Sequence, residues 1–203
     1  MINEPLYEYD ETCRADDTCV LCGVDEAGRG PLAGPVCCAA VVLDKEARYD
    51  GLNDSKKLTE KQRERLYDEI VKSCIAYSVV MVDNETIDEI NILQATLLGM
   101  KRAIEALALD PDIALIDGNI APQSDVACKA VIKGDSHSAC IAAASVLAKV
   151  TRDRHMAQLN AQYPEYGFAR HKGYPTKYHF QMIEQHGITP VHRKTFLKEP
   201  VEL

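Results

Sequence analysis

Short apolar runs and stripes with helical spacing alternate along this chain. Residues 20–24 and 36–43 are continuous apolar runs, and the second is predicted to be a strand that is buried on both faces and paired with the first. Residues 75–82 alternate as a third strand would, and the short runs 113–116 and 130–132 predict two further buried strands.

Helical stripes fall between and after these runs. Thr59 and Gln62 form a capping-box start, which predicts a helix whose apolar stripe continues to Cys74. Three more helices are predicted over residues 87–107, 138–159 and 176–186. We therefore expect an α/β fold, in which a central mixed β-sheet is flanked by helices and followed by a helical C-terminal extension.

The 203 residues divide into a short leader and one domain. Residues 1–20 hold six acidic side chains, one arginine and few apolar groups, so we expect them to form a loose acidic leader. Residues 21–203 are long enough to bury a core of their own, and the part from about residue 137 is predicted to be helical and basic.

The chain shows neither a membrane span nor a secretion signal, since its longest apolar run, 36–43, is far too short to cross a bilayer. We therefore expect a cytoplasmic protein with no membrane partner, whose eight cysteines are reduced thiols. Cys19 and Cys22 have the spacing of metal ligands, but no second pair follows nearby, so a metal or redox role is the minor alternative.

Charge is distributed unevenly along the chain, whose net charge is −8. Residues 1–128 carry 12 basic and 25 acidic side chains, whereas residues 129–203 carry 11 basic and 6 acidic ones and all six histidines. This asymmetry is typical of an acidic metal-binding half that faces a basic nucleic-acid-binding part, although ordinary surface charge would give the same counts.

Acidic residues end three of the predicted strands. Asp25 and Glu26 end the first, Asp117 the fourth and Asp135 the fifth, each with a glycine nearby. In open α/β sheets, ligands gather outside the carboxyl ends of strands. Four carboxylates packed there would repel one another unless cations that prefer oxygen ligands lay between them. The pattern favours two Mg²⁺ or Mn²⁺ ions, as in phosphodiester cleavage, and the alternative is a set of solvated loop acids.

The neighbourhood of the first acids leaves two questions open. Asp25 and Glu26 are adjacent and would point to opposite faces of a regular strand, so either the strand kinks or Glu26 contributes through its backbone or from a distance. Residues 28–33 match a loose dinucleotide-binding fingerprint, which we reject because a strand follows and Pro31 removes an amide donor. The glycines that flank Arg29 instead allow a close backbone approach to a ligand, or a plain hairpin turn.

Seven segments resemble the motifs of the ribonuclease HII family, in the family's order and between about residues 21 and 197. They are GVDEAGRGP at 23–31, LNDSKKL at 52–58, LIDGN at 115–119, KGDS at 133–136, AAASVLAKVTRD at 142–153, GFARHKGYPT at 167–176 and HRKTF at 192–196. A chance match to all seven is not credible.

The resemblance implies an RNase H-like fold and a catalytic domain over residues 21–203. It implies an endonuclease, dependent on two Mn²⁺ or Mg²⁺ ions, that cleaves the RNA strand of RNA–DNA hybrids. It also implies incision on the 5′ side of a single ribonucleotide in duplex DNA, as in ribonucleotide excision repair, leaving 3′-hydroxyl and 5′-phosphate ends. No obligatory protein partner is expected.

Motif position then assigns roles to individual residues. Metal binding and catalysis fall to Asp25, Glu26, Asp117 and Asp135. The resemblance implies that Gly28, Arg29 and Gly30 contact the ribose 2′-hydroxyl, and that Tyr174 packs on the next sugar at the RNA-to-DNA junction. Candidates for phosphate contacts, each of which is equally well explained as plain surface charge, are Lys56, Lys57, Lys149, Arg152 and Lys172.

The sequence departs from the family pattern at both ends. The acidic leader with Cys13 and Cys19 has no counterpart, and the chain stops soon after Phe196, without a basic extension that would strengthen duplex binding. Two alternatives remain: another two-metal nuclease on a related fold, and a catalytically silent hybrid-binding module, against which the four intact acids argue.

Overall fold

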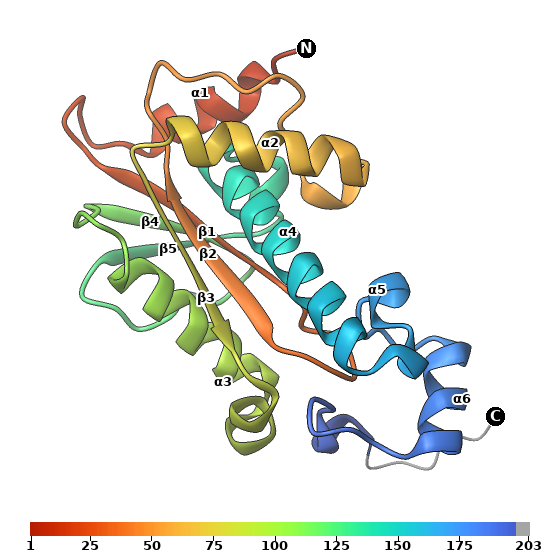
Figure 1. The fold of residues 1–203 in the computed structure, drawn as a ribbon. Helices are drawn as coiled ribbons and strands as arrows, with labels where there is room; N and C mark the ends of the chain where they lie inside the picture. The colour runs from red at the N-terminus through yellow and green to blue at the C-terminus, as the bar shows by residue number, and fades with distance from the viewer. Residues whose placement is uncertain (198–203) are drawn as a thin grey trace.

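A five-stranded sheet forms the centre of the computed structural model, which describes residues 1–197 (Figure 1). Its order is β3-β2-β1-β4-β5, with β1 antiparallel to β2 and parallel to β4. β3 is antiparallel to β2, and β5 is parallel to β4, so the predicted mixed sheet is confirmed. The strands are β1 (Leu21–Ala27), β2 (Val36–Val42), β3 (Ala76–Val82), β4 (Ile113–Asp117) and β5 (Ala127–Val131).

Helices cover both faces of this sheet, as Figure 1 shows. On one face lie α1 (Glu4–Cys13), α2 (Glu60–Ser73) and the long α4 (Ala139–Gln162), and on the other lies α3 (Asn84–Glu105). The short α5 (Phe168–His171) and α6 (Lys177–His186) form the C-terminal extension beyond one end of the sheet. The expected α/β, RNase H-like architecture is therefore confirmed.

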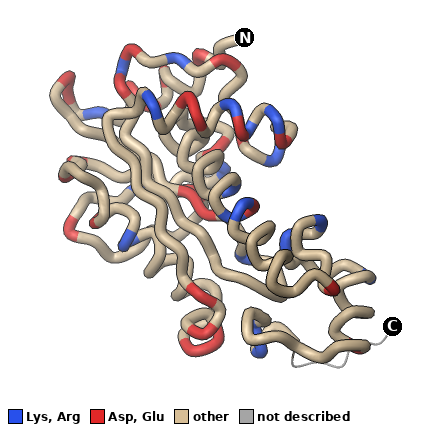
Figure 2. Tube along the Cα trace, in the orientation of Figure 1, with Lys and Arg blue, Asp and Glu red and all other residues tan. Residues whose placement is uncertain are grey.

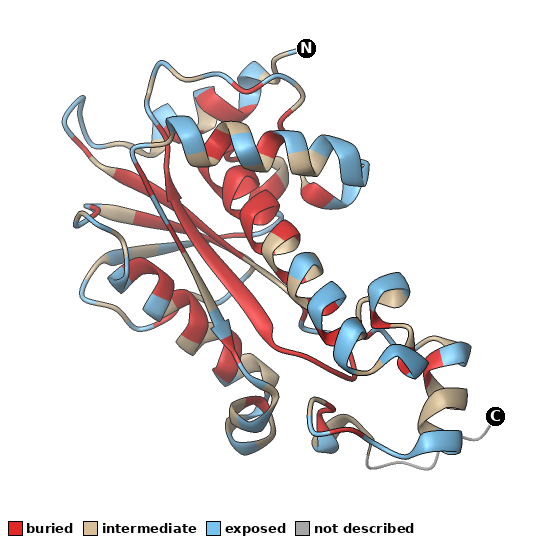
Figure 3. Cartoon of the chain, viewed as in Figure 1, coloured by how far each residue is buried: buried red, intermediate tan, exposed pale blue. Residues whose placement is uncertain are grey.

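The strands divide their side chains between two cores. Leu21, Ala39 and Val41 pack towards α1, α2 and α4, whereas their neighbours Cys22 and Ala40 pack towards α3. β2 is buried along its whole length, as predicted for a strand covered on both faces (Figure 3). α4 packs so closely on β1 that position 23 must be glycine, because a Cβ there would lie 2.1 Å from the Cys140 backbone.

Helix boundaries follow local signals. The capping box is present: the Thr59 hydroxyl accepts from the Gln62 amide, and the Gln62 side chain accepts from the Thr59 amide. α3 differs from the prediction of one unbroken helix, because Asn91 has a φ of 67°. Its carboxamide oxygen accepts from the amides of Leu93 and Gln94, so a second helical segment begins there.

The prediction of a loose leader is wrong for α1. Leu6 and Tyr7 are buried in the core beside α4, and the Tyr7 hydroxyl accepts a hydrogen bond from the Tyr49 amide at 2.9 Å. The buried Asp10 carboxylate accepts from the Cys140 amide at 2.9 Å, in the first turn of α4. α1 is amphipathic, and the acidic residues of its outer face led to the prediction of a loose segment.

All eight cysteines are free thiols in the structure. Among the described residues, no helix combines the length and apolar character needed to span a membrane. The predicted end of the domain, residues 198–203, lies outside the described part of the chain.

We expect Leu6→Ala to lower the free energy of unfolding by about 2–4 kcal/mol, because it removes a buried side chain from a packed core. The measurement is chemical denaturation, with Glu8→Ala on the exposed face of α1 as the matched control. Equal, small effects of both changes would show that α1 does not contribute to the core.

Candidate active site

Three carboxylates from three separate strand ends meet at one edge of the sheet. Each of Asp25, Asp117 and Asp135 offers an oxygen atom, and these atoms all lie within 4.8 Å of one another. Asp25 belongs to β1, Asp117 ends β4, and Asp135 follows β5 in a short 3-10 helix, η2 (Gly134–Ser136). Parallel pairing of β1, β4 and β5 produces this meeting, as the sequence predicted.

Asp25 lies at the most enclosed point of this cluster. Its side chain is buried under α4, where the hydroxyl of Ser145 is hydrogen-bonded to that of Ser55 at 2.7 Å. Burial, followed by the charges of Glu26 and Asp117, raises the pKa of Asp25 well above its usual value. The Glu26 amide, which donates to Asp25 at 2.6 Å, only partly offsets this by favouring the carboxylate.

Asp135 has a cationic neighbour, unlike Asp25. Burial and the charge of Asp117 raise the pKa of Asp135, while Lys56, whose Nζ lies 3.6 Å away, lowers it. Lys56 belongs to the 3-10 helix η1 (Ser55–Lys57), and its neighbour Lys57 donates to the Ser136 hydroxyl at 3.1 Å. Burial alone would lower the pKa of Lys56, but the surrounding carboxylates, Asp135 foremost, raise it.

Glu26 stands apart from the three-carboxylate cluster. β1 continues to Ala27 without a kink, so Asp25 and Glu26 begin on opposite faces of the sheet, with Glu26 on the side of α3. There it lines a cleft of about 220 Å³ together with Arg29 and Asp117, and its carboxylate lies 3.8 Å from the Arg29 guanidinium. Burial raises the pKa of Glu26 and Arg29 opposes the rise. The kink that would bring Glu26 to the other carboxylates is therefore absent, and a contribution of Glu26 through its backbone or from a distance stays a prediction.

The carboxylate cluster fits a divalent metal ion. Clustered oxygen donors of like charge, one of them fully buried, are poorly stable as bare carboxylates, and this is the donor set that Mg²⁺ and Mn²⁺ prefer. Among the described residues, this is the one group of acidic, histidine or cysteine side chains close enough to share an ion. The Cys19 and Cys22 pair takes no part in such a group.

The loop of Gly28, Arg29 and Gly30 lies beside this edge. Gly28 has a φ of 99°, and a Cβ there would lie 1.9 Å from the Arg152 side chain, so the position requires glycine. Gly30 faces the ring of Tyr174, since its own Cβ would lie 3.5 Å from the Tyr174 Cε1 atom. Tyr174 is 41% exposed. The structure therefore brings the loop and Tyr174 together, although they are more than 140 residues apart.

Two buried arginines support this loop, and sequence reasoning missed both roles. Arg152 is buried and donates to the carbonyls of Ala33, Pro35 and Lys172. A phosphate contact requires an exposed side chain, so the predicted phosphate contact of Arg152 is wrong. Arg193 donates to the carbonyls of Gly28, Arg29 and Gly34. Arg193 lies in the HRKTF motif, but no periodicity distinguishes a buried arginine from a surface one.

A pair of buried histidines supports Tyr174 in a similar way. The Thr189 amide donates to Nδ1 of His192, so in the neutral ring the proton is on Nε2, which donates to Nε2 of His179 at 3.1 Å. His179 then donates through Nδ1 to the Tyr174 carbonyl at 3.0 Å. Burial lowers the pKa of both rings to about 4, which keeps them neutral at pH 7.

The remaining basic candidates differ in their surroundings. Lys149 forms an ion pair with Asp153 at 2.8 Å, and Lys172 is half-buried with a left-handed backbone. Figure 2 shows lysine and arginine positions along the second half of α4 and around α5, which forms part of the basic C-terminal region. Lys56 and Lys57 remain the basic candidates nearest to the carboxylates.

Comparisons with known proteins agree with this arrangement. The model of the family described as Ribonuclease HII matches residues 22–199. A ribonuclease HII of Caldicellulosiruptor saccharolyticus is 56% identical over 197 residues, which are 97% of this chain and 96% of that protein. The chain belongs to the ribonuclease HII family. It is therefore a ribonuclease H endonuclease, a hydrolase that depends on divalent metal and acts on RNA–DNA hybrids.

The fold of the chain is also similar to solved structures of ribonucleases H2 and HII. The crystal structure of ribonuclease H2 from Pyrococcus horikoshii aligns with a TM-score of 0.71 and 29% identity, over 86% of this chain and 92% of that one. The ribonuclease HII in a complex with PCNA from Archaeoglobus fulgidus gives a TM-score of 0.71 and 26% identity, over 91% and 98% of the two chains.

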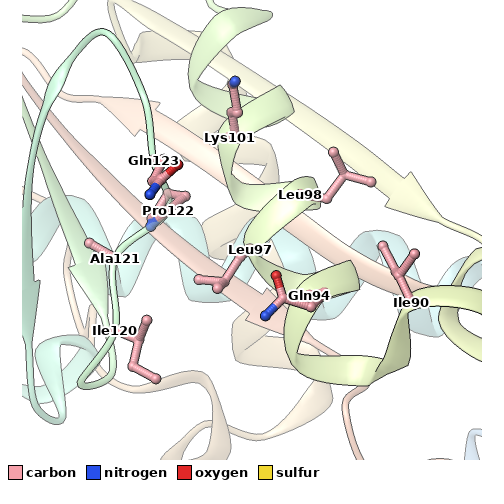
Figure 4. Close-up of a pocket in the computed structure, with 9 residues that line it drawn as sticks. All are labelled: Ile90, Gln94, Leu97, Leu98, Lys101, Ile120, Ala121, Pro122 and Gln123. Atoms are coloured by element: carbon pink, nitrogen blue, oxygen red, sulfur yellow. The ribbon is translucent and has the colours of Figure 1, made fainter.

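A second, larger hollow lies next to the Glu26 cleft. It has a volume of about 690 Å³ and lies between α3 and the segment after β4, with Leu97 and Ile120 lining both hollows (Figure 4). Its other walls are mainly aliphatic, with Gln94, Lys101 and Gln123 at the side. Its lining residues include no acidic side chain.

We expect Asp25→Asn to raise the melting temperature of the metal-free protein at pH 7 by about 2–4 °C, the shift that about 1 kcal/mol produces at this size. The folded pKa of Asp25 is raised, so its contribution to stability is present at low pH and is lost as the pH rises through that value. The gain from the substitution should therefore disappear near pH 4.

The matched control is Asp16→Asn, because hydrogen bonds from Thr18 lower the pKa of the exposed Asp16 and its replacement should bring no gain. Melting curves in EDTA and with Mn²⁺ complete the test, since an ion should stabilise the wild type more than the Asp25 variant. A lower melting temperature for Asp25→Asn in EDTA would contradict the repulsion in the cluster.

Proposed function

We propose that this ribonuclease HII nicks duplex DNA on the 5′ side of single embedded ribonucleotides and also cuts longer RNA–DNA hybrids. The products would carry 3′-hydroxyl and 5′-phosphate ends, as ribonucleotide excision repair needs. The observation that carries the proposal is the joint position of three features at one edge of the sheet: the carboxylate cluster, the Gly28–Arg29–Gly30 loop and the exposed Tyr174 ring. Action in the cytoplasm stays a prediction from the sequence.

The carboxylates would hold the metal. Asp25, Asp117 and Asp135 are the proposed direct ligands, with Glu26 adding negative charge from the α3 side. Two Mg²⁺ or Mn²⁺ ions would supply the activation of the attacking water and the stabilisation of the leaving oxygen. Lys56, whose Nζ lies 3.6 Å from Asp135, would contact the scissile or a neighbouring phosphate once an ion occupies Asp135.

The loop and Tyr174 would read the sugar. The 2′-hydroxyl is the group that distinguishes RNA from DNA, and an exposed loop with two glycines allows backbone groups to approach it. The Tyr174 ring beside Gly30 would pack on the following deoxyribose, where a second 2′-hydroxyl would be crowded. Lys57 is a proposed phosphate contact, and Lys149 and Lys172 are weaker candidates because both are half-buried and Lys149 is paired with Asp153.

The experiment that tests this function uses duplex DNA with one ribonucleotide, in Mg²⁺ or Mn²⁺. We expect a single internal nick on the 5′ side of the ribonucleotide, and a loss of at least about 10²-fold for Asp135→Asn, which removes a charged ligand at little change in volume. End-trimming would indicate a different nuclease, and retention of the duplex without a nick would indicate a binding module. Activity of Asp135→Asn within a few-fold of wild type at saturating Mn²⁺ would remove Asp135 from the site.

Tyr174 gives a separate prediction. Tyr174→Ala should reduce incision at a single ribonucleotide by about 10–100-fold, because the junction sugar loses the surface that positions it. Tyr174→Phe is the matched control and should retain most of the activity if ring packing is what matters. Melting temperature should change little, since the ring is 41% exposed. A large fall in melting temperature with a proportionate loss of activity would assign Tyr174 to the core instead.

A further inference from the structure

Arg193 is buried below the Gly28–Arg29–Gly30 loop and is not neutralised by a carboxylate in the described structure. Its three guanidinium nitrogens each donate to a backbone carbonyl: Nη2 to Gly28 at 2.7 Å, Nη1 to Arg29 at 2.9 Å and Nε to Gly34 at 3.0 Å. The side chain is fully buried, and its own amide donates to the Leu32 carbonyl at 2.8 Å. One residue near the C-terminal end therefore holds the loop at two carbonyls and the segment that follows it at a third, that of Gly34.

This arrangement fixes the direction of the loop's amides. The peptide bonds of the described chain are all trans, so each carbonyl and the amide of the same peptide unit point in opposite directions. Because the Gly28 and Arg29 carbonyls point down to Arg193, the amides of Arg29 and Gly30 must point away from it. Both residues are exposed, and among residues 1–197 neither amide has a protein acceptor.

We infer that Arg193 is a positioning residue that aims the Arg29 and Gly30 amides at the 2′-oxygen of the ribonucleotide. The inference rests on the proposed function, in which this loop reads the sugar. Two amide donors side by side at the surface favour an electronegative oxygen as their ligand, and the neighbouring Tyr174 ring places them on the sugar side of the substrate. Arg193 itself touches no substrate.

The geometry also explains why the residue is arginine. A planar guanidinium has donors spaced to hold two adjacent carbonyls at once, whereas a lysine ammonium is a single point of contact on a flexible chain. Arg193→Lys therefore keeps the positive charge and most of the volume but releases at least one of the two peptide units. The freed unit can rotate, and its amide then no longer has a fixed direction.

The test compares two quantities for Arg193→Lys. We expect kcat/KM for a duplex with one ribonucleotide to fall by at least about tenfold, mainly through kcat. The reason is that a misdirected contact near the reacting group lowers the rate of the chemical step. Affinity for the all-DNA duplex of the same sequence, measured in EDTA, should stay within about twofold, because phosphate contacts are unchanged. The matched control is Ile104→Ala, a buried residue of α3 that should lose stability without this selective effect.

Each outcome decides a different point. If the wild type makes no nick at the ribonucleotide, the proposed function fails. If the wild type nicks but Arg193→Lys keeps its kcat/KM within twofold, or loses activity only in proportion to stability as Ile104→Ala does, the role of Arg193 is overturned.

A measurement on the wild type covers the case in which Arg193→Lys does not fold. In EDTA, the ¹H–¹⁵N signals of the Arg29 and Gly30 amides should shift by a larger amount with the ribonucleotide duplex than with the all-DNA duplex. Equal shifts with both duplexes would overturn the inference that these amides are aimed at the 2′-oxygen.

Discussion

Parallel pairing of β1 with β4 and of β4 with β5 is the constraint on which the site depends. The register places Val24 beside Ile116 and Asp117 beside Val131, so the chain leaves all three strands at the same edge of the sheet. Acids at those three exits are forced together, and their repulsion opposes folding in the absence of metal. The sheet withstands it because β2 and the first half of α4 are buried almost without interruption.

A second constraint concerns the backbone rather than the acids. The segment between β1 and β2 has carbonyls that no strand ladder pairs, and buried carbonyls need donors. Arg152 and Arg193 donate to five of them, and Arg152 also donates to the Lys172 carbonyl. Neither guanidinium forms an ion pair with a carboxylate of the described residues, although the charges of Asp153 and Asp88 act on them from a distance. Burial and the charge of Arg152 lower the pKa of Arg193 to about 9, which still leaves it protonated at pH 7. These charges favour an anionic substrate at this edge, although the chain as a whole is acidic.

The sequence allowed the sheet and the acids to be predicted, because each has a local signature. Continuous apolar runs identified β1, β2 and β4, alternation identified β3, and the capping box identified the start of α2. The run at 130–132 was a poor guide to β5, which spans Ala127–Val131 and is buried only at Val131. The side chains that hold the loops have no such signature: Arg193 is buried only because tertiary contacts bring it to Gly28. The burial of Leu6 was missed for a different reason: α1 contains more polar and charged residues than apolar ones, so its composition alone does not predict a packed helix.

The C-terminal part of the chain connects the Tyr174 ring and the Gly28–Arg29–Gly30 loop, the two elements that we propose to face the substrate. His192 acts through His179 on the Tyr174 carbonyl, and the next residue, Arg193, acts on the Gly28 and Arg29 carbonyls. Consecutive residues of one motif therefore hold both the ring and the loop, which itself follows directly on β1. The sheet determines where a metal would bind, and residues 189–193 hold the ring and the loop that lie beside that position. In the proposed function, a small displacement of that segment would therefore affect sugar recognition more than metal binding.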